Sequence, residues 1–216
     1  MREYVTAADR IAREQTGPVL DWGCGFGHIS HLLREHGLTV TSVDYDPGSD
    51  LGGSSKPSDR FPDVQILFLE DAVKLPFADD SYDSVLSMGV LEHVLDPEGS
   101  VAEVRRVLRP GGTFYVYKLP NRFSYLEWIS RRLGMPYHGE REEDVLYTRR
   151  GARELLERHG FEVVELRLAN MLPLTLPGRL ARLASPVIWR LNVLLARVPL
   201  LNLLATNVEA VARNGR

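Results

Sequence analysis

The stretch Val19-Leu20-Asp21-Trp22-Gly23-Cys24-Gly25-Phe26-Gly27-His28 decides the fold class of this chain. Its first four residues form a short apolar segment typical of a buried strand, three alternating glycines follow, and a helical pattern begins at His28. Glycine permits tight turns and the close approach of a ligand to the backbone at the amino end of a helix. The stretch therefore predicts a ligand-binding loop between a strand and a helix. The dinucleotide pattern G-x-G-x-x-G would place Gly or Ala at position 28, where this chain has His28.

The rest of the chain alternates short apolar segments with helical patterns. Such alternation is typical of a parallel sheet with helices on both faces. The patterns predict strands at residues 19–22, 38–44, 64–69, 82–87, 112–118, 161–168 and 205–212. They predict helices at residues 1–16, 28–36, 99–108 and 149–159, and a loop at residues 48–63, which are rich in Gly, Ser and Pro.

Acidic side chains follow the second and third predicted strands. Asp44 ends the second strand, and a carboxylate at that position can accept hydrogen bonds from both hydroxyls of a ribose. Asp71-Ala72 follows the third strand, where a side-chain acceptor beside apolar backbone can read the amino edge of an adenine. Asp44 by itself fits any cofactor that carries a ribose, NAD included. Asp71-Ala72 discriminates further, because it is suited to recognise an adenine after the third strand.

With these motifs in this order, the chain resembles the class I S-adenosylmethionine-dependent methyltransferases. The resemblance covers about residues 15–170 and is strongest to the subgroup that methylates small molecules, including quinone precursors (the ubiquinone and menaquinone type) and other lipids. It rests on motifs that occur in the family's order: Asp21/Gly23/Gly25/Gly27, Asp44, Asp71-Ala72, Leu75-Pro76-Phe77, Asp80-Ser81-Tyr82-Asp83, Val90-Leu91-Glu92-His93-Val94 and Leu108-Arg109-Pro110-Gly111-Gly112.

The resemblance implies both a fold and a cofactor. The fold is α/β and Rossmann-like, with a mainly parallel seven-stranded sheet, helices on both faces and a helical insertion before an antiparallel last strand. The cofactor is S-adenosylmethionine, which leaves as S-adenosylhomocysteine. The implied cofactor-binding residues are Asp21, Gly23, Gly25 and Gly27 at the methionine part, Asp44 at the ribose, Asp71 and Ala72 at the adenine, and Ser87 and Met88 near the methyl group.

Methyl transfer needs the nucleophile, the methyl carbon and the sulfur in line, and it needs a general base only if the acceptor arrives protonated. The candidate bases are His93, which follows the fourth strand, and, in the segment after the fifth, Tyr137, His138 and Tyr147. His93 could also simply pack or cap. Glu92 and His93 alone make an incomplete set of metal ligands, and we expect no metal.

We expect one methyltransferase domain over residues 1–216. It divides into an N-terminal helix at 1–16, a cofactor-binding core at 17–119, an acceptor-side insertion at 120–148, and an apolar, arginine-bearing helical insertion at 171–204. The aromatic residues of the 120–148 insertion suit an apolar acceptor, and they would equally suit the core of a small lid.

The net charge of −3 conceals an asymmetry, since residues 171–216 carry +5 and the first 170 residues carry −8. An acidic body argues against nucleic acid as a partner. In the basic tail, Ser185-Pro186 predicts the start of a helix that runs to about Arg197, with Arg190 on nearly the same face as Arg197. Three interpretations stay open for this helix: contact with an anionic membrane, a roof over the substrate pocket, or packing in a core or homodimer seam.

The composition limits the cellular compartment and the relation of the protein to membranes. A single cysteine excludes an intramolecular disulfide framework and, together with the polar start of the chain, predicts a cytoplasmic protein, peripheral at the membrane if the tail docks there. We expect no membrane-spanning segment. The predicted function is methyl transfer from S-adenosylmethionine to a small, apolar or lipid-linked acceptor, on oxygen rather than carbon or nitrogen. The alternatives are a catalytically idle cofactor-binding scaffold of a membrane-associated biosynthetic complex and a nicotinamide-dependent oxidoreductase.

Overall fold

The computed structural model describes residues 2–45, 61–134, 144–172 and 179–216, with side chains in the last range from Pro186 onward. Its strands are β1 (Val19–Trp22), β2 (Val40–Tyr45), β3 (Ile66–Leu69), β4 (Tyr82–Met88), β5 (Leu108–Pro120), β6 (Phe161–Ala169) and β7 (Asn207–Asn214). Its helices are α1 (Arg2–Glu14), α2 (His28–Glu35), α3 (Pro97–Val107), α4 (Tyr125–Arg132), α5 (Arg149–Arg158) and α6 (Arg179–Leu195), with a 3-10 turn η1 (Leu201–Leu204).

The seven strands form one sheet in the order β3-β2-β1-β4-β5-β7-β6. The pairs β1·β2, β1·β4, β2·β3 and β4·β5 are parallel, whereas β7 runs antiparallel to both β5 and β6. The sheet is therefore mixed rather than purely parallel, in a Rossmann-like arrangement. The last strand is antiparallel as expected, although it begins at Asn207 rather than at residue 205.

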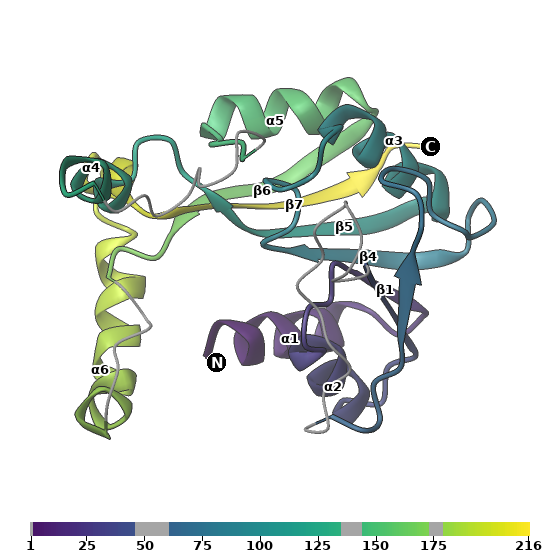
Figure 1. Cartoon of the computed structure of the whole chain (residues 1–216), viewed down its shortest axis with the longest axis horizontal. Helices are drawn as coiled ribbons and strands as arrows, with labels where there is room; N and C mark the ends of the chain where they lie inside the picture. The colour runs from purple at the N-terminus through teal and green to yellow at the C-terminus, as the bar shows by residue number, and fades with distance from the viewer. Residues whose placement is uncertain (1, 46–60, 135–143, 173–178) are drawn as a thin grey trace.

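Helices cover both faces of this sheet. Figure 1 shows α3 and α5 on one face and α1 and α2 on the other. Successive strand residues point to opposite faces, and Val85 and Leu86 of β4 accordingly enter two different hydrophobic clusters. Leu86 packs in the cluster that contains Ile11 of α1, and Val85 in the cluster that contains Val104 of α3.

Two boundaries differ from the sequence prediction for identifiable reasons. Strand β5 begins at Leu108, directly after α3, because Leu108 pairs with Tyr82 of β4. Helix α6 begins at Arg179, and Pro186 lies inside it, so the predicted helix start at Ser185-Pro186 is wrong. Proline in a helix removes one backbone donor, but the Arg, Leu and Ala residues before it favour helix strongly enough to extend α6 toward its amino end.

Helices α4 and α6 lie together at one end of the molecule, on the left of Figure 1, which is the end toward which β4 and β5 run. Residues 48–60 of the predicted loop lie outside the described residues.

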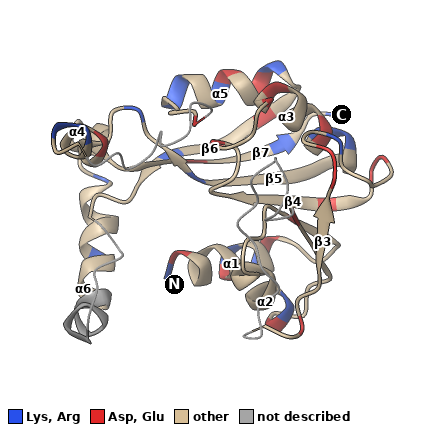
Figure 2. Ribbon diagram, viewed as in Figure 1, with Lys and Arg blue, Asp and Glu red and all other residues tan. Residues whose placement is uncertain are grey.

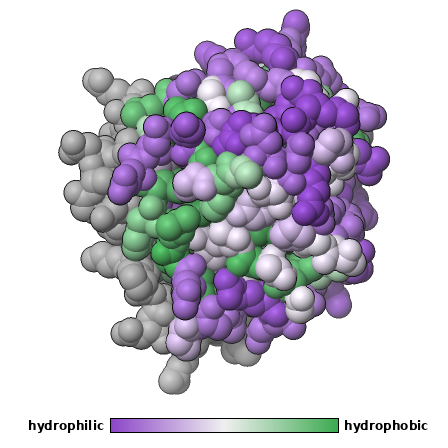
Figure 3. All heavy atoms as spheres, turned by 90° about the vertical axis from the view of Figure 1, so that its right-hand side faces the viewer, coloured by the Kyte–Doolittle hydropathy of each residue, from purple (hydrophilic) through white to green (hydrophobic). Residues whose placement is uncertain are grey.

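The end of the molecule opposite to α4 and α6, seen in Figure 3, is mainly hydrophilic along its top and right-hand rim. In the described part of the chain, no helix combines the length and the hydropathy that crossing a bilayer requires.

Candidate functional site

The glycine loop between β1 and α2 is held in a conformation that requires glycine. Gly23, Gly25 and Gly27 have φ angles of 74°, 56° and 77°, in the left-handed region that residues with a Cβ rarely adopt. A Cβ on Gly23 would lie 2.2 Å from Cγ2 of Val90, and no side chain fits there. The loop is tied to the sheet by the backbone N–H groups of Gly23 and Cys24, which donate to the carbonyl of Val43 at 2.9 and 3.0 Å.

Asp44 at the end of β2 lies against this loop. Its Oδ2 accepts a hydrogen bond from the backbone N–H of Gly25 at 2.7 Å, and its Oδ1 accepts one from the N–H of Tyr45 at 2.7 Å. Each carboxylate oxygen retains a lone pair after these contacts. The structure thus brings together the loop and the acid that the sequence singled out separately, with acceptor capacity left for two hydroxyl donors.

Asp21 is buried beneath the loop. Its Oδ2 accepts from the hydroxyl of Ser30 at 2.5 Å, and Ser30 in turn accepts from the hydroxyl of Ser42 at 2.7 Å. Burial, opposed in part by the Ser30 hydrogen bond, raises the pKa of Asp21 to about 7. In the structure this carboxyl joins β1 to α2, and the bond between Ser42 and Ser30 continues the link to β2.

This burial makes the stability of the fold depend on pH. A carboxyl whose pKa is higher in the folded than in the unfolded chain stabilises the fold below its unfolded pKa of about 4, and this contribution is lost as the pH rises through 7. The side chain in Asp21→Asn cannot ionise, so this variant does not lose that contribution as the pH rises. Its free energy of unfolding relative to the wild type should therefore increase between pH 4 and pH 8, by on the order of 3 kcal/mol, in urea titrations. Glu162→Gln, at an exposed position of β6, is the control. Parallel pH profiles for Asp21→Asn and the wild type would contradict the assignment.

Asp71 and Ala72 lie in the turn after β3. Oδ1 of the exposed Asp71 accepts from the backbone N–H groups of Val73 and Lys74, both at 2.8 Å, and these bonds lower the pKa of its carboxyl. The hydroxyl of Tyr45 donates to the carbonyl of Ala72 at 2.6 Å. This last contact, which the sequence analysis missed, joins the turn to the end of β2 beside Asp44.

The carboxyl end of β4 carries Ser87 and Met88. Ser87 is buried, and its hydroxyl has no hydrogen-bond partner among the described residues. Ser87 pairs in register with Trp22, the residue before the glycine loop, on the neighbouring strand β1. Ser87 and Met88 therefore lie at the same carboxyl edge of the sheet as the glycine loop and Asp44.

His93 follows β4 and contacts two acids. Its Nδ1 lies 2.7 Å from Oδ1 of Asp144, and its Nε2 lies 3.8 Å from Oε1 of Glu92. Glu92 is buried, and burial raises its pKa to about 7. The sequence analysis missed Asp144, because nothing in its local pattern indicates contact with a residue 51 positions earlier.

The other candidate bases are placed differently. Tyr137 and His138 lie outside the described residues. Tyr147 is buried in the main hydrophobic cluster and donates its hydroxyl to the carbonyl of Leu91 at 3.1 Å, which gives it a packing role. Across the described ranges, no three His, Cys, Asp or Glu side chains are grouped so as to hold a metal ion.

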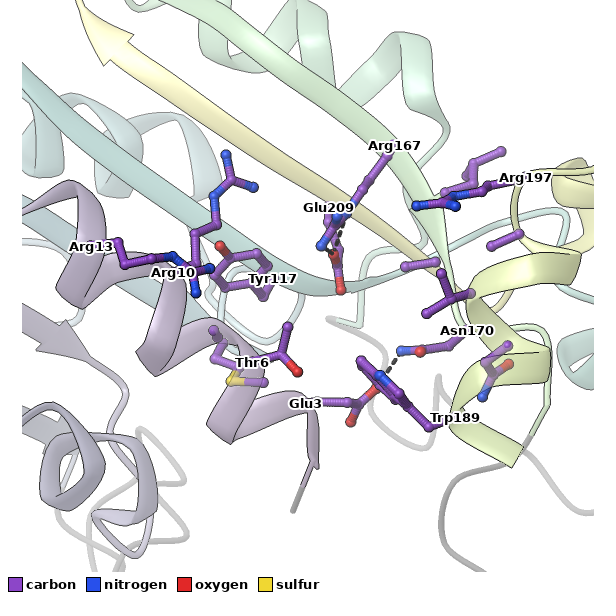
Figure 4. Close-up of a pocket in the computed structure, with 17 residues that line it drawn as sticks. Glu3, Thr6, Arg10, Arg13, Tyr117, Arg167, Asn170, Trp189, Arg197 and Glu209 are labelled. Atoms are coloured by element: carbon purple, nitrogen blue, oxygen red, sulfur yellow. Dashed lines mark hydrogen bonds and ion pairs between the residues drawn. The ribbon is translucent and has the colours of Figure 1, made fainter. Parts of the chain in front are cut away.

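A cavity of about 450 Å³ opens beside this edge. It lies between α1 and α6, over strands β4 to β7 (Figure 4). Its walls come from distant parts of the sequence: Glu3, Thr6, Ala7, Arg10, Arg13, Met88, Tyr117, Arg167, Leu168, Ala169, Asn170, Trp189, Asn192, Val193, Ala196, Arg197 and Glu209. Met88 therefore links the end of β4 to the cavity. Trp189, Asn192 and Val193 of α6 form one wall of the cavity.

Comparison with known proteins agrees with this geometry. A family model described as a methyltransferase domain matches residues 20–116. A probable S-adenosylmethionine-dependent methyltransferase from Mycolicibacterium smegmatis is 34% identical over 75% of this chain and 59% of its own length. A demethylmenaquinone methyltransferase from Renibacterium salmoninarum is 35% identical over 53% of this chain and 49% of its own length. The chain thus spans between 49% and 59% of the length of these two relatives.

Solved structures show the same fold. A methyltransferase of Haloferax volcanii, solved in complex with the Trm112 methyltransferase activator, superposes with a TM-score of 0.62 at 23% identity, covering 100% of this chain and 91% of its own. None of these findings supports the idle scaffold or the nicotinamide-dependent oxidoreductase.

Proposed function

Because the chain carries a methyltransferase domain of the class I S-adenosylmethionine-dependent family, we propose that it transfers a methyl group to a small, apolar or lipid-linked acceptor, on an oxygen atom. One observation carries the proposal. Met88 ends the strand that neighbours the glycine loop and also lines the cavity between α1 and α6. A cofactor at the loop and an acceptor in the cavity would therefore meet at the end of β4.

The residues present fit the cofactor that this family uses. The positive φ angles of the loop, the remaining acceptor capacity of Asp44, and the unpartnered hydroxyl of Ser87 support binding at the carboxyl edge of the sheet. When bound, S-adenosylmethionine supplies a methyl group already activated by a sulfonium. The chain's own task is then to hold an acceptor atom in line with that methyl group and to exclude water.

A hydroxyl acceptor needs a base, and we propose His93, in the segment after β4, for this role. The carboxylate of Asp144, 2.7 Å from Nδ1, favours the tautomer that carries its proton on Nδ1 and leaves Nε2 to accept a proton. We assign His93 as the base and Asp144 as its positioning residue. This pair supports an acceptor that arrives as a protonated hydroxyl.

Incubation with methyl-labelled S-adenosylmethionine and host-cell extract, followed by organic–aqueous partition, tests the proposal. We expect label in the organic phase above a no-enzyme blank, and a loss of about tenfold or more in its rate of appearance with His93→Gln. Label confined to the aqueous phase would contradict an apolar acceptor. Unchanged turnover by His93→Gln would show that His93 is not the base. The proposal of methyl transfer itself would stand.

We also propose that residues 171–204 bring the protein to a membrane surface, consistent with a cytoplasmic protein whose one cysteine, Cys24, is buried. Helix α6 and the turn after it have an outer face opposite to the cavity. Val187, Leu191 and Leu194, spaced to share one side of α6, are all exposed. After the helix Val198 is exposed too, and Leu200 is 80% exposed. An apolar helical face with few acids is typical of contact with a lipid interface.

Exposed hydrophobic side chains also gather on and around α4. Thirteen of the eighteen exposed large hydrophobic side chains in the described ranges lie in residues 123–133 and 187–204. The two segments are tied together, because Nδ2 of Asn121 donates to the carbonyls of Leu203 and Ala205 at 2.9 and 2.7 Å. Figure 2 shows little acidic colour on the described part of α6. Arg122, Arg131, Arg132 and Arg190 flank these hydrophobic residues in the chain and complement an anionic lipid surface.

Sedimentation with vesicles of phosphatidylglycerol and phosphatidylcholine tests this contact. Leu191→Glu with Leu194→Glu should reduce the bound fraction at least severalfold, because two charges would enter the apolar interface. Val164→Glu, which alters an exposed valine on β6, is the control and should sediment like the wild type. Equal sedimentation of all three proteins would overturn the proposal. A doubled mass in solution that the paired glutamates abolish would instead identify the face as a homodimer seam.

A further inference from the structure

The cavity between α1 and α6 has a wall rich in positive charge. Four arginines and two glutamates line it. Both glutamates have partners: Glu209 accepts from Nη2 and Nε of Arg167 at 2.7 and 2.8 Å, and Glu3 accepts from Asn170 and lies 3.9 Å from Nζ of Lys118. Arg10 is paired with Glu14 and Glu165, at 2.9 and 2.8 Å. The acids on this wall are therefore already neutralised by partners within the protein.

The cations are not all neutralised in the same way. Within the described residues, the guanidinium groups of Arg13 and Arg197 contact no carboxylate at ion-pair distance. Both line the cavity, Arg13 from α1 and Arg197 from the chain just after α6. A ligand in the cavity thus faces an excess of positive charge.

Tyr117 of β5 adds an uncharged donor to this wall. Its side chain is 3% exposed, and its hydroxyl has no hydrogen-bond partner among the described residues. Burial raises its pKa to about 12, and the hydroxyl keeps its proton at neutral pH. A buried O–H without an acceptor is costly, and a ligand oxygen would remove that cost. Figure 4 shows Tyr117, Arg10 and Arg13 together at one end of the cavity and Arg197 at the other.

The remainder of the wall is apolar. Met88, Leu168, Val193 and Ala196 contribute aliphatic surface, and Trp189 contributes an aromatic ring. An ion as small as free phosphate would leave this surface without contacts. A hydrocarbon alone would leave the hydroxyl and the guanidinium groups without an acceptor.

We infer that the cavity binds the methyl acceptor through an anionic group, a carboxylate or a phosphate, carried on an apolar body. The anion lies at the α1 end, where it accepts from Tyr117 and faces Arg13. The apolar body extends along Met88 toward Trp189 of α6. This inference rests on the proposed function, because it assigns the cavity to the acceptor, and it deepens that function by naming the chemical class of the acceptor.

Calorimetric titration of the whole protein, in the presence of S-adenosylhomocysteine, tests the inference. The probes are octyl phosphate, octanoate, octanol and inorganic phosphate. We expect octyl phosphate or octanoate to bind at least about tenfold more tightly than octanol, since hydrogen bonds to charged groups contribute more than neutral ones. The preferred anion then distinguishes a phosphate from a carboxylate source. Equal affinity for octanol and for both anionic probes would overturn the inference, and so would equal affinity for octyl phosphate and inorganic phosphate.

Two variants separate binding from folding. Tyr117→Phe removes a hydroxyl that has no hydrogen-bond partner among the described residues. It should lower the affinity for the preferred anionic probe about tenfold without lowering the melting temperature. Arg13→Gln should act in the same direction, whereas Arg150→Gln, at an exposed position of α5, is the matched control. A Tyr117→Phe variant that melts earlier and binds the probe normally would give Tyr117 a structural role and contradict the inference.

Binding of S-adenosylhomocysteine alone is measured in parallel. Its absence from the wild type would contradict the proposed function itself. Its presence, together with no preference for anionic probes, would contradict only the assignment of an anionic acceptor.

Discussion

Gly23→Ala should abolish measurable binding of S-adenosylmethionine and destabilise the fold by about 2–5 kcal/mol. Two causes add at this position. The φ angle of 74° is strained for any residue with a Cβ, and that Cβ would lie 2.2 Å from Cγ2 of Val90. Relief of the clash must displace either the loop, which belongs to the proposed cofactor site, or the segment that directly follows Ser87 and Met88. Urea titration gives the stability, and calorimetry gives the affinity.

Gly25→Ala is the matched control for stability. Gly25 also has a positive φ, 56°, but a Cβ there would meet nothing within 4 Å. Only the backbone strain of about 1 kcal/mol should remain. Val90→Ala placed in the Gly23→Ala protein should recover part of the lost stability, because it shortens the side chain that the new Cβ meets. Equal destabilisation by Gly23→Ala and Gly25→Ala would show that the contact with Val90 does not restrict the loop.

Asp44→Ala should weaken the binding of S-adenosylmethionine by about 1–3 kcal/mol, or roughly 5- to 150-fold in affinity, measured by calorimetry. The carboxylate is proposed to accept both ribose hydroxyls, and its loss also leaves the N–H of Gly25 without its acceptor at 2.7 Å. Asp44→Asn keeps one oxygen acceptor, and we expect an intermediate loss of affinity. Asp79→Ala, an exposed acid that pairs with Arg106, is the control and should bind normally. Unchanged affinity in Asp44→Ala would remove this residue from the ribose site.

Local patterns predicted the elements around the glycine loop with little error. Strand β1 occupies residues 19–22 as expected, and α2 begins at the expected His28. Both follow from short-range physics, because a buried apolar segment, glycine conformational freedom and helical periodicity are all encoded within a few residues. The same holds for α5, which ends one residue earlier than expected.

The tail was harder to predict, because local signals compete there. Ser185-Pro186 has the local chemistry of a helix start, yet α6 runs through it. The periodicity of α6 suggested a very apolar helix and could not say which side faces the protein. Its inner side, with Trp189 and Val193, closes a cavity, while Leu191 and Leu194 stay exposed. That assignment depends on what packs against the helix.

Strand ends, turns and the acids that follow them depend on residues close together in the chain. Local patterns therefore predicted the α/β class and the positions of Asp44 and Asp71, and the resemblance to a known family implied the cofactor. Contacts between distant parts of the chain became visible only in the folded molecule. It places Asp144 beside His93, orders β7 between β5 and β6, and assembles a charged cavity from α1, the sheet and α6. The physical reason is that such contacts depend on how the sheet twists and how the helices pack on it. No single segment of the sequence encodes that geometry.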